Sequence, residues 1–435
     1  MKRFAISTLG CKVNSYESEN YISQLVNIGF KQVSFSEVAD IYIINSCVVT
    51  NTAAAKSRKK IFQARRLNDK ALICLVGCYV QIDYKKLQEY NIDVLIGTSQ
   101  KKDLARHILN ALDNQKTINV VPTDEVEFEY LAVERFANQS RAFLKIQDGC
   151  NSFCSYCIVP LARGRERSLS AELVIESARK LVSNGYQEIV LTGIHTGRYY
   201  HNKTNLVSLI KQILTIKQLK RLRISSIEIN EVTDELLEFI KSNDRIARHL
   251  HIPIQSTSNR ILKLMNRKYT IEEFATRIAN IRELIPDIAI STDVIVGFPS
   301  ETEADFLAMS ATLARLNFAF LHVFPYSRRD NTKAASIKPQ ITNIIKKERV
   351  NTLLSLSKEL SKQYRQRFLD QSVLVYVESI KNGFYIGYCS EYFEVSIKSN
   401  LDLRKKFVFV TIYKVTNEKC FGKVEDDYEK NIATD

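Results

Sequence analysis

A short segment of the chain carries three cysteines with the spacing C-x3-C-x2-C: Cys150, Cys154 and Cys157. Three thiolates on one loop can bind three irons of a cubane iron–sulfur cluster and leave the fourth iron without a protein ligand. The amine and carboxylate of S-adenosylmethionine can chelate that iron. An electron passed into the sulfonium then releases a 5′-deoxyadenosyl radical, which removes hydrogen from an unactivated C–H bond. The triplet therefore predicts a catalytic [4Fe–4S] cluster that works with S-adenosylmethionine.

A structural zinc loop and simple burial of the three cysteines are the alternatives to a cluster. Zinc normally takes four ligands, often in two close pairs, and no matching second pair follows nearby in the sequence. The loop also comes directly after a predicted strand of a β/α repeat, at the end where such folds place catalysis. Both observations favour the cluster over zinc.

The segment Gly149–Cys157 and its continuation Ile158–Ser168 resemble the radical-SAM methylthiotransferases, and the resemblance covers almost the whole chain. Members of that family carry three more cysteines in an N-terminal domain. The matching contexts here are Gly-Cys-Lys-Val-Asn at 10–14, Asn-Ser-Cys-Val-Val-Thr at 45–50 and Gly-Cys-Tyr-Val-Gln at 77–81. The resemblance implies a second, auxiliary [4Fe–4S] cluster bound by Cys11, Cys47 and Cys78.

The positions of these three cysteines also make sense without the resemblance. Each one ends one of the first three predicted parallel strands, and such strand ends line one crevice of an open α/β sheet. Burial in the core is the plainer alternative, and buried cysteines are common. The remaining cysteines match no family pattern, and we take them as structural: Cys74, Cys389 and Cys420.

Three further segments resemble family regions around S-adenosylmethionine. Leu191–Gly197 corresponds to the region near the methionyl amine, where glycines would let backbone carbonyls approach the ligand closely. His251–Ser256 and Asp293–Pro299 correspond to regions around the ribose, carboxylate and adenine. Taken alone, each segment also fits an ordinary strand end, and His251 fits a structural histidine. The cofactor-binding residues that the resemblance implies are Thr192, Gly193, His195, Gln255, Asp293 and Gly297.

Three bacterial branches of the family are well known. Two modify the tRNA adenosine 3′ of the anticodon, after isopentenylation or after threonylcarbamoylation, and the third modifies an aspartate of a ribosomal protein. The strings at 192–197 and 10–17 resemble the threonylcarbamoyladenosine branch. They imply conversion of N6-threonylcarbamoyladenosine to its 2-methylthio derivative by sulfur insertion and methyl transfer. The alternatives are the other two branches, another radical reaction on RNA such as methylation, and a non-catalytic tRNA-binding protein structured by zinc.

The elements that must position these residues fall into three regions. In the first, strands predicted at 3–9, 40–46, 71–76 and 93–97 alternate with helices at 14–28 and 52–67, which is typical of an open parallel α/β sheet. A polar stretch near 121–139 reads as a linker. In the second, strands predicted at 141–146, 188–191, 221–225, 249–254, 288–296 and 318–324 alternate with helices, one of them opened by a Thr270-x-x-Glu273 capping box. This pattern predicts a full or partial β/α barrel.

A basic helix at about 343–367 leads to the third region, where alternation with period two predicts four or five strands: 373–378, 384–389, 393–398 and 407–415 among them. We expect a small, OB-like β-barrel that resembles the RNA-binding TRAM domain. Its aromatics could stack on bases and its cations could meet phosphates, although strand aromatics are more often core. The candidates are Tyr385, Tyr388, Tyr392, Phe393, Phe407, Lys398, Arg404, Lys405 and Lys406. Further candidates beside the cysteine triplet are Arg163, Arg165 and Arg167.

The domains expected are therefore 1–139 (methylthiotransferase domain with the auxiliary cluster), 140–368 (radical SAM domain) and 369–435 (TRAM domain). One position departs from the family: Asn331 stands where glycine is usual, and asparagine tolerates left-handed backbone best after glycine.

The overall composition bears on partners. The net charge of +14 comes from 62 Lys and Arg against 48 Asp and Glu residues, which suits a polyanion such as tRNA or merely a solvated basic surface. Nine cysteines, an odd number, argue against a disulfide framework. No window approaches the ~20 apolar residues of a membrane span. We expect a cytoplasmic monomer that binds the anticodon stem-loop of tRNA, takes electrons from a flavodoxin-like reductant and contacts no membrane.

Overall fold

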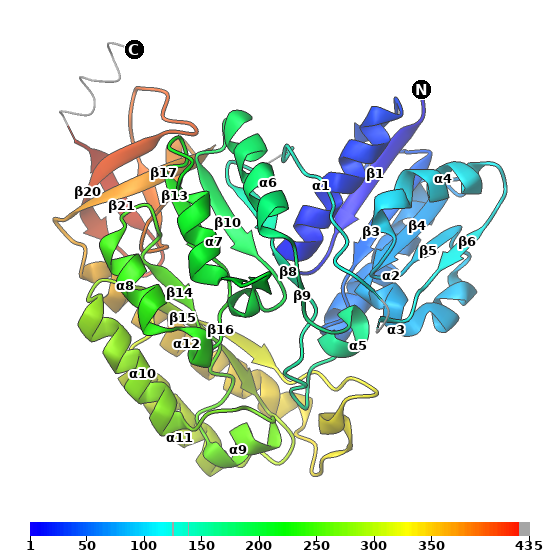
Figure 1. Cartoon of the computed structure of the whole chain (residues 1–435). Coiled ribbons are helices and arrows are strands. Elements are labelled where there is room, and N and C mark those ends of the chain that lie inside the picture. The colour runs from blue at the N-terminus through cyan, green and yellow to red at the C-terminus, as the bar shows by residue number, and fades with distance from the viewer. Residues whose placement is uncertain (124–125, 138, 426–435) are drawn as a thin grey trace.

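The structure is a computed structural model that describes residues 1–123, 126–137 and 139–425. Residues 124, 125 and 138 of the predicted linker and residues 426–435 of the predicted C-terminal domain lie outside the described residues. The N-terminal sheet with its helices lies beside a central β/α unit, and a small β-barrel packs on the other side of that unit (Figure 1).

The first region forms a six-stranded parallel sheet within the described residues. Its strand order is β2 (Lys31–Val33), β1 (Arg3–Thr8), β3 (Ile41–Ser46), β4 (Leu72–Gly77), β5 (Val94–Ile96) and β6 (Thr117–Asn119). Its helices are α1 (Lys12–Asn27), α2 (Asn51–Leu67), α3 (Cys78–Leu87) and α4 (Leu104–Leu112), with a 3-10 turn η2 (Lys101–Asp103) before α4. Every residue of β3 and β4 is buried, as expected for strands covered on both faces.

The central region forms the predicted partial barrel. Its parallel strands are β7 (Ala142–Lys145), β10 (Glu188–Thr192), β13 (Arg221–Ile224), β14 (His249–His251), β15 (Ala289–Val296) and β16 (Phe320–Pro325). Single bridges from Leu222 to Ile246 and from Ser226 to His251 join the two three-stranded halves. The covering helices are α6 (Ala171–Ser183), α7 (Leu206–Ile213), α8 (Asp234–Ser242), α9 (Asn259–Leu264), α10 (Ile271–Leu284), α11 (Glu303–Leu316) and α12 (Asn343–Gln366). The predicted Thr270–Glu273 capping box opens α10.

One predicted strand is shorter in the structure. β14 ends at His251, although the sequence pattern extends to Ile254. The chain still follows β15, because the amides of Ile252 and Gln255 donate to the carbonyls of Ser291 and Asp293. Pro253 has no amide hydrogen, and Gln255 has a φ of +63°, so the regular ladder stops before them.

The C-terminal region is the predicted barrel. Within residues 369–425, five strands close in the order β17 (Ser372–Lys381), β18 (Phe384–Cys389), β19 (Glu394–Ile397), β21 (Cys420–Val424) and β20 (Phe407–Val415). Its interior is apolar and includes the buried Cys389 and Cys420. In the described part of the chain, no helix has the length and the apolar character that a membrane crossing would need.

The predicted linker contributes to the core. Leu131, Val133 and Phe136 are buried in the hydrophobic cluster of the central region. The Tyr16 hydroxyl of α1 donates to the Leu131 carbonyl at 2.5 Å. The connection therefore fixes the N-terminal sheet against the partial barrel.

Candidate active site

The cysteine triplet lies on the loop that follows β7. A short antiparallel pair, β8 (Gln147–Asp148) with β9 (Arg167–Ser168), closes the base of this loop, and α5 (Val159–Arg163) follows the last cysteine. The Cys150 amide donates to the Gly164 carbonyl, and the Cys157 amide donates to the Cys154 carbonyl. Gly149 is required at the turn, because its φ is +73° and a Cβ there would lie 1.9 Å from the Arg165 carbonyl oxygen.

Two polar side chains reach these thiols, one from the loop after β10 and one from the turn between α9 and α10. His195 Nδ1 lies 3.5 Å from Cys150 Sγ, and His195 Nε2 lies 2.8 Å from a carboxylate oxygen of Glu231. Arg267 donates to Cys154 Sγ at 3.4 Å. Burial disfavours the Cys150 thiolate, yet hydrogen bonds from His195 and Ser152 outweigh that effect and lower its pKa. Sequence motifs included His195 but gave no signal for Glu231 or Arg267.

The second triplet forms at the carboxyl ends of three neighbouring strands. Cys11 follows β1 after a short turn that ends in a glycine, and Cys47 and Cys78 directly follow β3 and β4. A Cβ built on Gly10 would lie 2.9 Å from Cys47 Cβ and 3.2 Å from its sulfur. Burial raises the pKa of Cys47 to about 11, and the nearby thiols of Cys78 and Cys11 add to the shift. The structure thus brings together three residues that are far apart in sequence.

Both triplets fit an iron–sulfur cluster better than a single zinc ion. All six cysteines are free thiols. A zinc ion needs ligand atoms about 4 Å apart, because each zinc–sulfur bond is about 2.3 Å long. In the described part of the chain, three ligand atoms within 4.8 Å of one another occur at His251, Asp293 and His322 and at neither cysteine triplet. Three thiols in each triplet match the three protein ligands of a cubane cluster whose fourth iron is open.

A buried group of charges lies between the two triplets. Glu17 of α1 contacts Lys101 Nζ at 2.6 Å, Lys145 Nζ at 3.2 Å and Arg163 Nη1 at 3.0 Å. Asp148 contacts Lys145 and Arg163 as well, at 2.6 and 3.2 Å. We call these five residues the buried ion cluster.

The buried ion cluster corrects one expectation from the sequence. Arg163 is 1% exposed, so it does not reach RNA phosphates. Arg167 is half-buried, and its guanidinium donates to the carbonyls of Arg163 and Arg165. Arg165 is exposed, with its guanidinium 4.9 Å from the centre of the Phe153 ring. Motif spacing alone could not distinguish these arginines, because their burial depends on docking between two domains.

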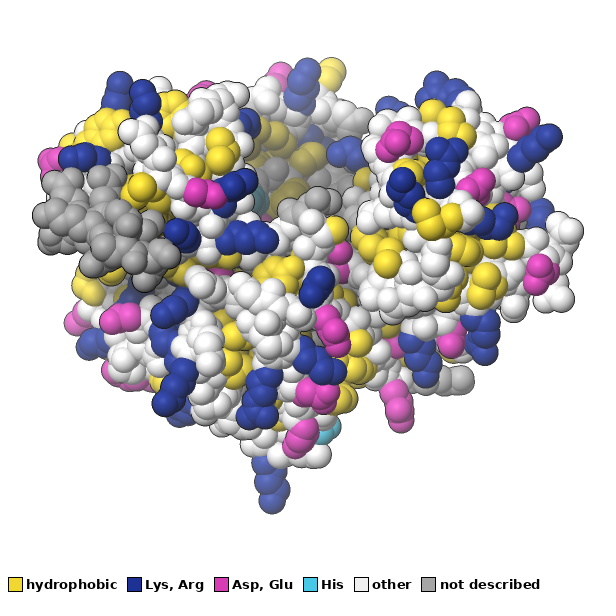
Figure 2. All heavy atoms as spheres, turned by 90° about the horizontal axis from the view of Figure 1, so that it is seen from above, with side chains coloured by type: hydrophobic (Ala, Val, Ile, Leu, Met, Phe, Trp, Pro, Cys, Tyr) yellow, Lys and Arg dark blue, Asp and Glu magenta, His cyan; other side chains and the backbone are white. Residues whose placement is uncertain are grey.

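A cavity of about 450 Å³ opens beside the second triplet. Figure 2 shows the surface hollowed between the lobe that carries the C-terminal barrel and the lobe that carries the N-terminal sheet. The lining comes from all three regions: Gly10, Cys11, Lys12 and Val13 of the N-terminal sheet domain, Tyr392 of the C-terminal barrel, and the inward side chains and ends of the central strands, among them Arg141, Thr192, Gly193, Arg223, His249, His251, Ser291, Asp293, His322 and Phe324.

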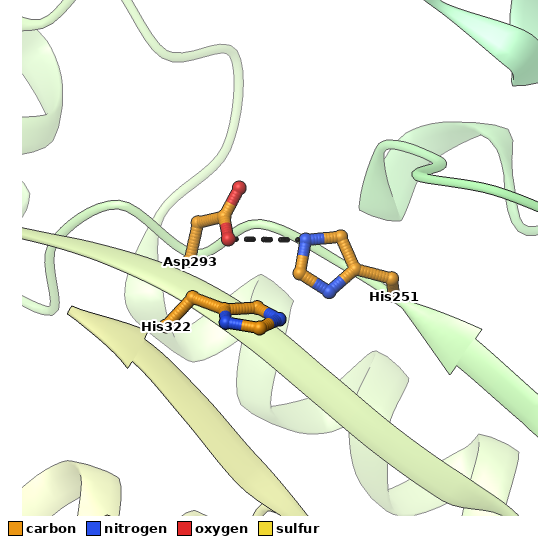
Figure 3. A group of neighbouring side chains, drawn as sticks. All are labelled: His251, Asp293 and His322. Atoms are coloured by element: carbon orange, nitrogen blue, oxygen red, sulfur yellow. Dashed lines mark ion pairs between the residues drawn. The ribbon is translucent and has the colours of Figure 1, made fainter. Parts of the chain in front are cut away.

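Two histidines and a carboxylate point toward one another from β14, β15 and β16 in this cavity (Figure 3). His251 Nε2 lies 3.1 Å from Asp293 Oδ1, and His251 Nδ1 lies 2.8 Å from the Ser291 hydroxyl. Both ring nitrogens of His251 therefore have partners within the protein. Sequence reasoning missed His322; the alternation of Phe320, His322 and Phe324 along β16 was the available signal.

The residues implied to bind S-adenosylmethionine are spread over one end of the partial barrel. Thr192, Gly193 and Asp293 line the cavity, and His195 lies beside Cys150. Gln255 donates its amide to the Asp293 carbonyl. Gly297 lies farther along, where a Cβ would be 2.4 Å from Cγ of Lys346 in α12. Three of the six residues therefore line the cavity together with Cys11, and His195 contacts Cys150. Gln255 is attached to Asp293, and Gly297 packs against a covering helix. The left-handed turn at Asn331 is present, with φ at +68°.

Most of the barrel aromatics that the sequence suggested as RNA contacts pack against other side chains of the protein. Phe393 is buried in the barrel core, and Phe407 is buried with the Arg221 guanidinium 4.7 Å from its ring centre. The Tyr392 ring stacks on His249 at 4.2 Å, and Tyr388 lies 5.0 Å from the Arg141 guanidinium. This aromatic face of the barrel packs against the central domain, so Phe393 and Phe407 are wrong as RNA contacts. Lys398, Arg404, Lys405 and Lys406 are exposed, as are Phe409 and Tyr413 on β20.

Comparisons with known proteins agree with this architecture. Residues 144–313 match the radical SAM superfamily, and residues 3–97 match the uncharacterized protein family UPF0004. Among solved structures, the radical S-adenosylmethionine methyltransferase TsrM from Kitasatospora setae, with cobalamin and a [4Fe–4S] cluster bound, has a TM-score of 0.56 over 77% of each chain. At 14% sequence identity this likeness shows the fold alone.

Full-length relatives are more similar in sequence. The threonylcarbamoyladenosine tRNA methylthiotransferase MtaB of Bacillus subtilis is 40% identical over 98% of both chains. The protein of the same name from Aquifex aeolicus is 38% identical over 85% of this chain and 90% of its own. The tRNA-2-methylthio-N(6)-dimethylallyladenosine synthase of Acetivibrio thermocellus is 32% identical over 97% of this chain and 91% of its own. With two cysteine triplets on a radical SAM fold and these relatives over nearly its whole length, the chain belongs to the radical SAM family of tRNA methylthiotransferases.

Proposed function

We propose that this enzyme converts N6-threonylcarbamoyladenosine, 3′ of the tRNA anticodon, to its 2-methylthio derivative with two [4Fe–4S] clusters and S-adenosylmethionine. The observation that carries the proposal is the cavity between the triplets. Cys11 lines it directly, and so do Thr192 and Gly193, which shortly precede the His195 that contacts Cys150. The choice of substrate rests on two relatives named threonylcarbamoyladenosine tRNA methylthiotransferase, which are 40% and 38% identical to this chain.

The two triplets divide the chemistry in this proposal. When bound, the cluster at Cys150, Cys154 and Cys157 with S-adenosylmethionine supplies a 5′-deoxyadenosyl radical, and the cluster at Cys11, Cys47 and Cys78 supplies the sulfur that is inserted. His195 and Arg267 hold the thiols of Cys150 and Cys154 by hydrogen bonds.

At the end of β10 the chain packs closely against Gln147, and this packing shapes one wall of the site. A Cβ on Gly193 would lie 3.0 Å from Gln147 Cβ, so a side chain there would require Gln147 to move by a few tenths of an ångström. The Gln147 side chain also accepts the His195 amide at 2.7 Å. We propose that Thr192, Gly193, His195, Gln255, Asp293 and Gly297 form the S-adenosylmethionine side of the site.

The exposed cations of the C-terminal barrel support an RNA contact. Lys398, Lys405 and Lys406 have exposed side chains, and Phe409 and Tyr413 on β20 are 45% and 54% exposed. Cations that meet phosphates beside aromatics that stack on bases are typical of single-stranded RNA sites. We propose that this surface holds the anticodon stem-loop while the target adenosine enters the cavity.

The proposal also includes a role for each region of the chain, a cellular location, an oligomeric state and a reductant. Residues 1–139 would carry the auxiliary cluster, 140–368 the radical chemistry and 369–435 the RNA contact. A tRNA substrate places the enzyme in the cytoplasm. We further propose that it works as a monomer and that a flavodoxin-like protein reduces it.

Nucleoside analysis of tRNA tests the function. Protein with reconstituted clusters is incubated anaerobically with S-adenosylmethionine, a reductant and tRNA that carries either threonylcarbamoyladenosine or isopentenyladenosine. We expect the 2-methylthio product from the first tRNA. Methylthiolation of the isopentenyl tRNA alone would reject the substrate assignment. Zinc in place of iron and sulfide in anaerobically purified protein would reject the enzyme.

A further inference from the structure

The wall of the cavity and the layer of side chains behind it hold more cations than carboxylates: Arg141 and Arg223 line the cavity, and Arg221 and Glu188 lie behind them. Glu188 is fully buried and contacts Arg223 at 2.6 Å, Arg221 at 3.2 Å and Arg141 at 3.8 Å. Arg141 also contacts Glu378 at 2.7 Å. Three guanidinium groups therefore share two carboxylates. Asp293, on the opposite wall, is already held by His251 at 3.1 Å. The cavity thus keeps an excess of positive charge in a partly dry environment.

Lys12 adds a further cation at the edge of the same cavity, where its side chain is open to solvent. Within the residues that the structure describes, its ammonium makes no hydrogen bond and no ion pair. It lies close to Tyr392 and to the guanidinium groups of Arg141 and Arg223, whose positive charges act on it. It is also the first residue of α1, whose first turn carries no acidic side chain. A cation at this end of a helix opposes the helix dipole, so stability does not explain Lys12.

We propose that Lys12 binds the carboxylate of the threonine moiety on the substrate adenosine. This inference rests on the proposed function, because it needs an acceptor nucleoside with an anionic substituent. Threonylcarbamoyladenosine ends in a free carboxylate, whereas an isopentenyl group is apolar and would leave the Lys12 ammonium desolvated without a partner. Lys12 directly follows Cys11, so an anion held there would lie beside the triplet proposed to supply sulfur. Lys12 is thereby a specificity-determining residue.

A substrate pair that differs in one charge tests this role. Two anticodon stem-loops are made with the same sequence, one with threonylcarbamoyladenosine and the other with its methyl ester, which keeps the shape and removes the charge. Binding of each to cluster-loaded protein is measured anaerobically. We expect the wild-type protein to bind the acid at least about tenfold more tightly than the ester, because the ester cannot form the charge-assisted hydrogen bond with Lys12.

The variants separate the charge of Lys12 from other effects. Lys12→Gln should bring the ratio of acid to ester affinity close to one, and Lys12→Arg should preserve most of it. Lys70→Gln removes an exposed lysine from the loop before β4 and should leave both affinities unchanged. Iron and sulfide are measured for each protein, so that loss of the auxiliary cluster is recognised.

Two results would overturn the inference while the proposed function stands. One is a Lys12→Gln protein that keeps the wild-type ratio. The other is a wild-type protein that methylthiolates the threonylcarbamoyl stem-loop yet binds acid and ester equally; Lys12 would then only balance the charge of the auxiliary cluster. A wild-type protein that methylthiolates isopentenyladenosine and leaves threonylcarbamoyladenosine untouched would instead overturn the proposed function, and the inference with it.

Discussion

The cysteine thiols are held by backbone turns that have no room for a side chain. Gly77 precedes Cys78 with φ at +104°, and a Cβ there would lie 2.8 Å from the Ser46 carbonyl oxygen. Gly149 precedes Cys150 in the same way. Each glycine lets the chain turn sharply from a strand end, so that the next residue points its sulfur toward the site.

Gly77→Ala should therefore lower both stability and cluster content. The unfavourable φ costs about 1–3 kcal/mol before the clash with Ser46 is counted. Urea unfolding of the apoprotein and the iron content after reconstitution measure the two effects. Gly29→Ala is the matched control, because Gly29 has φ at +86° and no atom within 4 Å of its Cβ position. If Gly77→Ala costs no more than Gly29→Ala, the close packing at Gly77 has no role.

Cys11→Ala should separate the two proposed clusters. Removal of one of three ligands should eliminate about half of the iron bound after reconstitution. Cleavage of S-adenosylmethionine, which needs only Cys150, Cys154 and Cys157, should continue, while no 2-methylthio product forms. Cys74→Ala changes a buried cysteine inside β4 and should keep both activities. Loss of cleavage in Cys11→Ala would contradict this division of labour.

At the scale of residues, local motifs singled out the candidate ligands but not the side chains around them. The six cysteines could be singled out because each follows a strand in a short recognisable string. The burial of Arg163 and the contact of Arg267 with Cys154 could not be predicted, because each joins residues more than a hundred positions from its partner in the chain or depends on docking of the N-terminal sheet.

At the scale of elements, α1 is attached to the partial barrel through buried charges as well as through Tyr16. Glu17 lies near the middle of α1, and its three cationic partners come from η2, β7 and α5. Burial disfavours ionisation of Glu17, but Arg163, Lys101 and Lys145 outweigh it and hold its pKa well below the ordinary value. The buried ion cluster therefore holds the N-terminal sheet against the loop of Cys150.

Glu17→Gln should destabilise the protein by about 3–5 kcal/mol at pH 7, because it leaves three buried cations with Asp148 alone. The lowered pKa of Glu17 fixes the sign of the pH dependence. Its contribution is complete above the ordinary pKa of 4.5 and is lost as pH falls below it, so the difference from wild type should shrink in acid. Urea unfolding at pH 7 and pH 4 measures this difference.

Glu238→Gln is the control for Glu17→Gln. Glu238 lies on the exposed face of α8, and its replacement should change stability by less than about 0.5 kcal/mol at either pH. A Glu17→Gln protein that matches this control at pH 7 would show that the buried ion cluster adds nothing to the docking of α1.

Period and propensity were enough to predict most strands, but not the short edge strands or the helices α3 and α4. β3 and β4 are continuous apolar runs, and β17 to β20 alternate in character, so their positions followed from the sequence. β2 and β6 have three residues each, Lys-Gln-Val and Thr-Ile-Asn, and carry too few apolar residues to be recognised. They are strands because β1 and β5 offer unpaired edges.

At the scale of the whole molecule, one cavity is shared by three domains. α1 closes it from the N-terminal domain, the inward side chains of β13 to β16 form its walls, and Tyr392 of the C-terminal barrel stacks on His249 at its base. This use of the barrel explains why the RNA-facing aromatics could not be chosen from the sequence. A barrel strand presents one face to its own core and one outward, and the sequence does not say which outward residues another domain covers.

The exposed cations of the C-terminal barrel should then affect every tRNA equally, in contrast to Lys12. In the triple variant Lys398→Gln, Lys405→Gln and Lys406→Gln, fewer counterions are released on binding, so the slope of log affinity against log salt should fall by roughly two to three. Affinity should drop by the same factor for threonylcarbamoylated and unmodified stem-loops. The same charge change at Lys217, Lys220 and Lys241, exposed on the central domain, should leave the slope unchanged. Equal slopes for both triple variants would show that the barrel lysines do not contact RNA phosphates. A surface that binds phosphates must release counterions when the RNA binds.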